Sequence, residues 1–129
     1  MHNIKVKVYY EDTDAGGVVY YGNYLRFLER ARIEFLAEKG IDVVKYHYEG
    51  LFFVVVHVDI SYKKPAKLGD IINISTEPIE IKNATITFLN KITNNDDDLL
   101  VEAKVTIACM GTDGKPKRFP QEIKKVLLS

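Results

Sequence analysis

The stretch NYLRFLERARIEFLAEKG, residues 23–40, decides the fold because it is the one long helical pattern in a chain that otherwise reads as strands. Asn23 is a favoured residue for capping the start of a helix, and Gly40 stands where a left-handed stop is expected. Apolar residues recur at spacings of three and four, as on one buried helix face: Tyr24, Phe27, Leu28, Ala31, Phe35 and Leu36. These signals predict a helix of roughly 16 residues, about 24 Å long.

Apolar and polar residues alternate on both sides of this helix, which is the period of a half-buried strand. The strands predicted in this way cover residues 4–10, 54–62, 72–76, 84–92 and 99–109. The third strand continues beyond these residues until Asn83, and Pro78 inside it predicts an edge position or a bulge there. A short helix is expected from Gln121. One long helix and five antiparallel strands predict an α+β fold in which the sheet wraps around a central helix.

Length and charge narrow the class of protein. The chain has 129 residues, which predicts a single domain over residues 1–129. Lys plus Arg and Asp plus Glu are 18 each, a balance that argues against nucleic acid and against a polybasic membrane surface as partners. The longest apolar run, residues 51–56, is too short to span a membrane. No signal-peptide pattern is present, and the lone Cys109 forms no intrachain disulfide, so we expect a soluble cytoplasmic protein.

The stretch YEDTDAGGVVYYGNY, residues 10–24, places carboxylates and two glycines just before the helix. Gly16 and Gly17 allow the backbone to approach a ligand closely. The first amides of a helix have no internal partner, and the helix dipole adds positive potential there. Such donors suit an oxygen that gains negative charge during acyl transfer. The alternative is an ordinary tight loop in which Asp12 and Asp14 form turns or caps.

Residues 9–20, followed by Asn23-Tyr24 and by the ERAR of residues 29–32, resemble the signature of the 4-hydroxybenzoyl-CoA thioesterase family. They are especially similar to the branch of bacterial acyl-CoA thioesterases that is associated with the Tol-Pal envelope system. A second, weaker match is YKKPAKLGD at residues 62–70, and the similarity covers roughly residues 5–127. The resemblance implies a hot-dog fold and an enzyme that hydrolyses acyl-coenzyme A.

The resemblance also implies residue roles. The catalytic carboxylate of the family falls on Asp14, and the backbone amide that polarises the carbonyl falls on Tyr21. The branch often carries histidine at this second position, so the tyrosine keeps the backbone donor but removes any imidazole. Asp12 is expected to shape the loop, and residues 16–18, Gly16, Gly17 and Val18, are expected to contact substrate. Whether Asp14 acts as nucleophile, through a mixed anhydride, or as general base is left open.

Basic residues near two turns are candidates for holding the phosphates of the coenzyme. The candidates are Lys63, Lys64 and Lys67, together with Lys115, Lys117 and Arg118. Of these, Lys63, Lys64 and Arg118 are taken as substrate-binding residues. Each one alone also fits a solvated surface charge.

Other chemistry is not favoured by the remaining residues. His57 lies among valines and is expected to be packed, and Cys109 is expected to be a buried strand residue. The spacing of Asp12, Asp14 and Gly16 faintly resembles a calcium loop, but such a loop needs glutamate at the position of Asn23. Zinc spacings, Walker loops and dinucleotide fingerprints are absent from the sequence. We therefore expect neither a metal nor a cofactor.

Three functions remain in competition. The first is an acyl-CoA thioesterase. A hydratase or dehydratase on the same fold would need an acid/base pair, and residues 3–46 contain no histidine. A non-catalytic acyl-CoA or acyl-carrier-protein binding or scaffolding module would not require Asp14. Acyl chain length and the choice between coenzyme A and acyl-carrier protein are left open.

The predicted sheet also bears on assembly. A five-stranded sheet leaves a long edge, and such edges are usually paired or covered. We therefore expect a homodimer whose sheets join edge to edge with the site at the subunit boundary, doubled into a homotetramer.

Overall fold

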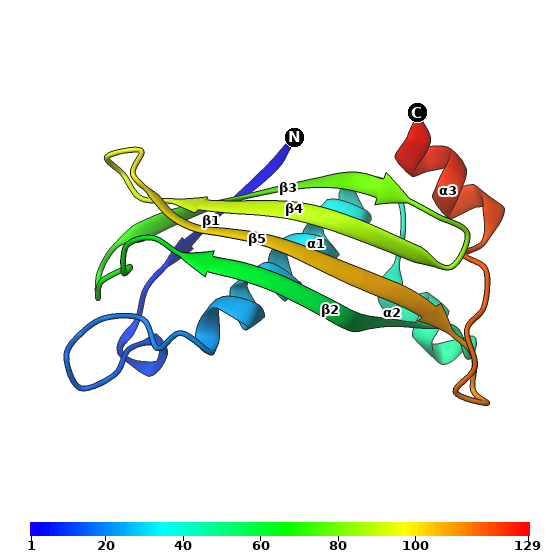
Figure 1. The fold of residues 1–129 in the computed structure, drawn as a ribbon, viewed down its shortest axis with the longest axis horizontal. Coiled ribbons are helices and arrows are strands. Elements are labelled where there is room, and N and C mark those ends of the chain that lie inside the picture. The colour runs from blue at the N-terminus through cyan, green and yellow to red at the C-terminus, as the bar shows by residue number, and fades with distance from the viewer.

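The computed structural model of the protein describes residues 1–129. The elements in chain order are β1 (His2–Lys7), η1 (Tyr10–Asp12), α1 (Asn23–Glu38), α2 (Val43–Tyr48), β2 (Phe52–Tyr62), β3 (Ile71–Ile81), β4 (Thr85–Thr93), β5 (Leu99–Met110) and α3 (Gln121–Leu128). The strands form one five-stranded sheet in the order β1-β3-β4-β5-β2, and every neighbouring pair is antiparallel. Helix α1 lies across one face of this sheet (Figure 1). The expected α+β arrangement is confirmed.

Helix α1 packs into the sheet with the face that its sequence predicts. The six predicted apolar residues are all buried, and Arg32 is buried with them. The first half of the helix packs around Phe27 against β1 and β3, and the second half packs around Phe35 with Phe88 and α3. The core therefore holds α1 along its whole length, so that the loop before the helix starts from a fixed point.

The two ends of α1 differ in how well the sequence predicts them. The residue at the N-cap is Gly22, with no side-chain cap, and Asn23 instead donates its side-chain amide to the carbonyl of Asp12 at 2.9 Å. The expectation that Asn23 caps the helix was therefore wrong, because Asp12 offers it a tertiary acceptor. Gly40 has φ +82°, and its amide and that of Ile41 return to the last turn of the helix at 2.9 and 2.8 Å. The predicted left-handed stop is confirmed.

Replacing Gly40 by alanine is expected to lower the free energy of unfolding by about 1–2 kcal/mol, because a side chain at φ +82° is strained. Gly40→Asn is the matched control and should lose less, since asparagine tolerates this region better. Thermal unfolding followed by circular dichroism measures both. Equal stability of Gly40→Ala and the natural protein would contradict the role of this glycine.

Other segments depart from the sequence prediction. The first strand ends at Lys7 rather than Tyr10, because Tyr10–Asp12 turn into a 3-10 helix. The short helix α2 was not predicted. It begins at Asp42, whose side chain accepts the Lys45 amide at 3.1 Å. Pro78 does mark a bulge, between Pro78 and Glu80. The prediction of a packed His57 was wrong: its side chain is exposed.

The sheet has one long free edge. Strand β2 pairs only with β5, so its other edge is open from Phe52 to Tyr62, with a register shift between Val55 and His57. The end of β2 at Tyr62 lies near the start of α1, since the hydroxyl of Tyr62 donates to the carbonyl of Tyr21 at 3.3 Å. Among the helices, none has the length and apolar character needed to cross a membrane.

Candidate active site

The loop before α1 closes as a small hairpin. Thr13 pairs with Val19, the Asp14 amide donates to the carbonyl of Val18 at 2.9 Å, and the Gly17 amide donates to the carbonyl of Asp14 at 3.1 Å. Gly17 has φ +78°, a conformation that favours glycine. The turn thus fixes the backbone of Asp14 while leaving its side chain at the surface.

The carboxylate of Asp14 has a single partner within the protomer. Oδ1 accepts the amide of Gly16 at 2.9 Å, and neither oxygen forms an ion pair. A Cβ atom at residue 16 would stand only 3.3 Å from this oxygen, so glycine there allows the carboxylate to lie close over the turn. Asp14 is therefore oriented by the loop and still has one oxygen that no protein group occupies.

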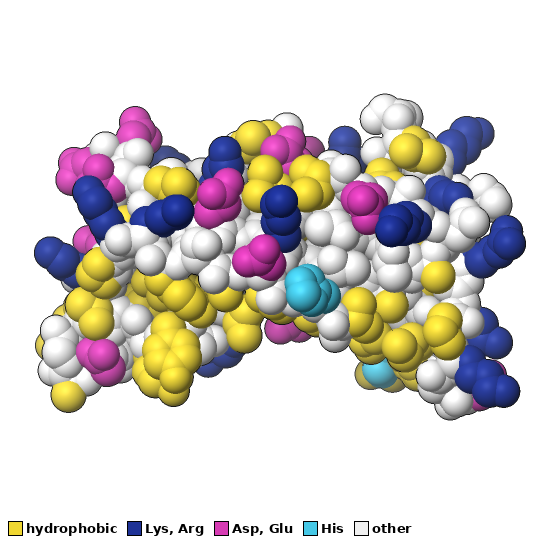
Figure 2. Space-filling view, viewed as in Figure 1, with side chains coloured by type: hydrophobic (Ala, Val, Ile, Leu, Met, Phe, Trp, Pro, Cys, Tyr) yellow, Lys and Arg dark blue, Asp and Glu magenta, His cyan; other side chains and the backbone are white.

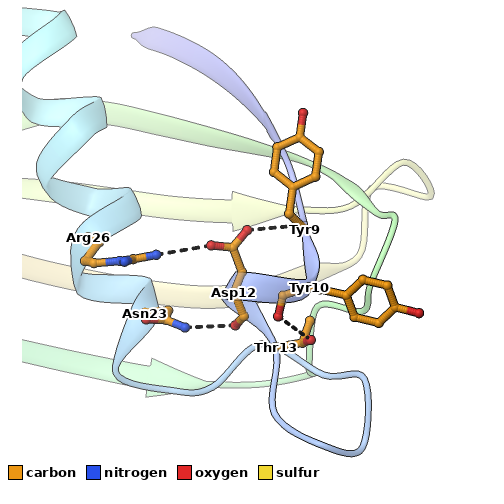
Figure 3. A network of polar contacts seen from close by, with 6 residues as sticks. All are labelled: Tyr9, Tyr10, Asp12, Thr13, Asn23 and Arg26. Atoms are coloured by element: carbon orange, nitrogen blue, oxygen red, sulfur yellow. Dashed lines mark hydrogen bonds and ion pairs between the residues drawn. The ribbon is translucent and has the colours of Figure 1, made fainter.

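Asp12, only two residues away, is placed in the opposite way (Figure 3). Its side chain is buried, and it accepts the amide of Tyr9 at 2.9 Å and the guanidinium of Arg26 at 3.1 Å. Its carbonyl also accepts the side chain of Asn23. These contacts join the 3-10 turn to α1. The structure agrees with the prediction that Asp12 shapes the loop.

The start of α1 presents amides without an acceptor. The amide of Asn23 donates to the carbonyl of Tyr20 at 2.8 Å, and that of Tyr24 donates to Tyr21 at 3.3 Å. The amides of Tyr21 and Gly22 donate to no group in the protomer. They stand at the end of the helix where the dipole is positive, so both are suited to an oxygen that carries negative charge.

A cavity of about 220 Å³ opens beside this helix end. It is lined by Val19, Tyr21, Tyr24, Tyr62, Lys63, Lys64 and Pro65. The structure therefore brings Tyr21 together with two of the predicted phosphate-binding lysines. Asp14 and residues 16–18 lie outside its lining, in the adjoining hairpin.

The two segments that carry the family resemblance lie side by side. Val18 pairs with Lys67, and the amide of Val19 donates to the carbonyl of Ala66 at 2.9 Å. The buried hydroxyl of Tyr24 accepts the amide of Ala66 at 3.0 Å. Burial raises the pKa of Tyr24, so the phenol stays protonated. The sequence analysis did not predict that the hydroxyls of Tyr24 and Tyr62 bond to this region or that both rings line the cavity. An aromatic residue in a strand or helix pattern predicts only a core position.

Arg118 is not part of this cavity. It lines a separate hollow of about 490 Å³ with Lys117 and Asp113, beyond the end of β5. Figure 1 places that end of the sheet opposite the loop before α1. Within one protomer, the predicted grouping of Arg118 with Lys63 and Lys64 is therefore not formed.

Comparison with known proteins shows the family of the chain. The family model of the thioesterase-like superfamily matches residues 8–127. The chain belongs to this superfamily. The acyl-CoA thioesterase YbgC of Haemophilus influenzae is 44% identical over 121 residues, which cover 92% of this chain and 88% of the relative. The acyl-CoA thioester hydrolase YbgC of Escherichia coli is 40% identical over 119 residues, which cover 92% of this chain and 89% of the relative.

Solved structures of other proteins show the same fold. A hypothetical protein from Aquifex aeolicus superposes with a TM-score of 0.92 at 30% identity, covering 98% of this chain and 99% of that one. A probable thioesterase from Bartonella henselae gives a TM-score of 0.87 at 37% identity, covering 92% of this chain and 98% of that one. The expected hot-dog fold of thioesterases is confirmed.

Proposed function

We propose that this chain hydrolyses the thioester of an acyl-coenzyme A to a free acid and coenzyme A. The observation that carries the proposal is that one loop holds both an exposed carboxylate, Asp14, and the start of a helix whose amides at Tyr21 and Gly22 have no acceptor. The YbgC relatives, which are acyl-CoA thioesterases by name, support it. We further place the chain in the Tol-Pal-associated branch and in the cytoplasm.

Asp14 has two chemical routes to the same products. As a general base, it takes a proton from water while the water oxygen bonds to the carbonyl carbon; the tetrahedral intermediate then breaks its C–S bond, and the thiolate leaves with that proton. As a nucleophile, its free oxygen bonds to the carbonyl carbon and expels the thiolate, and water then hydrolyses the mixed anhydride. Both routes need a carboxylate with an open oxygen, which the turn at Gly16 provides.

Both routes also place negative charge on the carbonyl oxygen. The amides of Tyr21 and Gly22 are the donors available to it, and they are fixed before the substrate arrives because the core holds α1 in place. Donors arranged in advance are the most effective form of such stabilisation. The tyrosine at position 21 changes nothing in this role, because the backbone supplies the hydrogen bond.

The phosphates of coenzyme A need cations near the cavity. Lys63 and Lys64 line it, although Lys64 also lies 3.5 Å from Asp98. Arg118 would reach the site only from a second copy of the chain. Phe52, at the start of β2, pairs with Met110, at the end of β5. The turn after β5, which leads to Arg118, therefore lies near the start of β2. If two β2 strands pair in antiparallel fashion, that start lies beside Tyr62 of the other copy.

This geometry supports the proposal of a homodimer joined at the free edges of β2. A twofold axis makes such an interface self-complementary, and it would cover the unpaired backbone groups of Phe52–Tyr62. Each site would then lie at the subunit boundary and take Arg118 from the partner subunit. Further doubling to a tetramer is part of the same proposal.

The competing functions find less support. A hydratase would need an acid/base partner at the helix start, but His57 lies on the outer strand and His2 contacts Glu38 at 2.9 Å near the other end of α1. A binding module, for acyl-CoA or acyl-carrier protein, would have no use for an oriented and exposed Asp14.

Thiol release from a panel of acyl-CoAs, followed with a thiol-reactive dye, tests the proposal. We expect steady turnover of at least one acyl-CoA by the natural protein, and the panel itself would report the preferred chain length. Repeating the panel on acyl-carrier-protein thioesters would identify the carrier. Binding of acyl-CoAs without any release of thiol would instead identify a binding module.

A further inference from the structure

Arg32 is a largely buried residue whose guanidinium lines a cavity and has no hydrogen-bond or ion-pair partner in the protomer. Its side chain comes from the middle of α1 and is only 8% exposed, yet its guanidinium forms neither a hydrogen bond nor an ion pair in the protomer. Burial lowers the pKa of Arg32, and the negative charge of nearby Glu29 opposes this shift. Buried charges in proteins are normally paired, because an unpaired one is costly. The guanidinium nitrogens are not fully enclosed in the protomer, so a chain that covered them would have to supply a partner.

Arg32 lines a cavity of about 440 Å³ between α1 and the free strand β2. The walls are mostly apolar and consist of Leu25, Leu28, Phe53, Val54, Val55, Val58 and Val105, and the polar residues are Arg26, Glu29 and Arg32. Arg26 already bonds to Asp12. Glu29 is exposed and, like Arg32, has no ion pair. The cavity thus holds one unpaired cation and one unpaired anion.

The surface around this cavity is apolar and open. Leu25, Val55 and Val56 are 46%, 48% and 49% exposed. Figure 2 shows hydrophobic side chains gathered along the lower side of the molecule, which is the side of the β2 edge in Figure 1. Exposed apolar surface beside a free strand is typical of a surface that another chain covers.

We propose that a second copy of this chain closes the cavity, with Arg32 bonded to Glu29 of the partner subunit and Glu29 bonded in return to Arg32 of the partner subunit. The inference rests on the edge-to-edge dimer of the proposed function and adds the polar contact that fixes its register. In a twofold interface, a contact from one residue to another is repeated in the reverse direction. Glu29 and Arg32 are three residues apart, about 4.5 Å along the helix axis. A twofold axis that passes α1 at a point between these two residues would place Glu29 within reach of Arg32 of the partner subunit. The same axis would place Arg32 within reach of Glu29 of the partner subunit.

An acidic ligand is the other candidate for the guanidinium, and the cavity disfavours it. A carboxylate that entered to meet Arg32 would share the cavity with the carboxylate of Glu29 and be repelled by it. A second copy avoids this conflict, because it supplies one cation for each anion. Residues 53–55 and 58 of β2 line the same cavity, so the proposed twofold axis would serve both the strand pairing and the ion pairs.

Charge reversal at the two positions tests the pairing. In Glu29→Arg, each arginine at 29 would face Arg32 of the partner subunit, and in Arg32→Glu each glutamate would face Glu29 of the partner subunit. Each variant alone is expected to weaken dimerisation by about a hundredfold or more, since like charges placed together at an interface cost several kcal/mol. An equimolar mixture of the two variants pairs opposite charges at both contacts and should form heterodimers. The double variant Glu29→Arg/Arg32→Glu should dimerise again. Sedimentation velocity and native mass spectrometry measure these states.

Controls keep the outcomes separate. Glu34→Arg changes an exposed glutamate of the same helix that does not line the cavity and should leave the dimer intact. If either reversed variant fails to fold, Glu29→Gln replaces it and should weaken the dimer by about tenfold.

Two results would overturn the pairing while leaving the hydrolase proposal standing. One is a natural dimer that both reversed variants retain. The other is a retained dimer with an altered preference for acyl-CoAs that carry an acidic group, which would assign Arg32 to the substrate. A monomeric natural protein that still hydrolyses acyl-CoA would remove the dimer and this inference together.

Discussion

Replacing Asp14 by asparagine should lower kcat for acyl-CoA hydrolysis by about a hundred- to ten-thousand-fold, the usual range for a lost acid/base group. This corresponds to about 3–5 kcal/mol in the activation barrier. The physical reason is that an amide can neither accept a proton from water nor attack the thioester. The asparagine side-chain oxygen can still accept the amide of Gly16, so the turn should survive. Thiol release at saturating substrate measures the change.

The same variant should keep its free energy of unfolding within about 0.5 kcal/mol of the natural protein, because Asp14 is exposed. Glu11→Gln is the matched control: it removes another exposed carboxylate from the same loop, one that forms no hydrogen bond or ion pair, and should leave kcat unchanged. Full activity in Asp14→Asn, or an equal loss in Glu11→Gln, would remove Asp14 from the mechanism.

Replacing Asp12 by alanine should instead act on stability, lowering the free energy of unfolding by about 2–3 kcal/mol. Its buried carboxylate accepts the Tyr9 amide and the Arg26 guanidinium, and hydrogen bonds to a charged group contribute about 1.5–3 kcal/mol. Because the Arg26 side chain is about half exposed, water replaces part of its lost contact. Urea unfolding followed by circular dichroism measures the difference.

Glu11→Ala serves as the stability control for this second variant and should shift unfolding by no more than about 0.5 kcal/mol. The two aspartates are thus expected to separate cleanly, with Asp12 governing stability and Asp14 governing turnover. An Asp12→Ala protein as stable as the natural one would show that the 3-10 turn is held by its backbone alone.

The loop shows how far the sequence could predict a site. Residue types and spacing, together with the family resemblance, indicated a shaping role for Asp12 and a catalytic role for Asp14. The structure then distinguishes the two side chains by burial. Asp12 is buried and bonded to Tyr9, Arg26 and Asn23, whereas Asp14 is exposed. The cavity at Tyr21 was not predictable, because Tyr62 and Pro65 also line it. These residues lie at and after the end of β2, far from Tyr21 in the sequence.

Arg118 lies outside the cavity of its own protomer for a similar reason. Its position near a turn resembles that of Lys63 and Lys64, but sequence spacing does not say at which end of a sheet a turn lies. The antiparallel course of β5 carries Arg118 to the end opposite the loop. The sequence pattern likewise does not indicate the burial of Arg32, and only the fold shows that it is largely buried and has no partner in the protomer.

By itself, the sequence determined the local features of this protein: the strands, the buried face of α1, the stop at Gly40 and the carboxylate-glycine loop before the helix. These follow from side-chain periodicity and backbone preference, which act over a few residues. Only the tertiary structure decided which carboxylate is buried, which residues form the cavity at Tyr21, and that Arg32 is left unpaired beside a free strand. Burial and pairing depend on segments far apart in the chain, and no local pattern encodes where those segments meet.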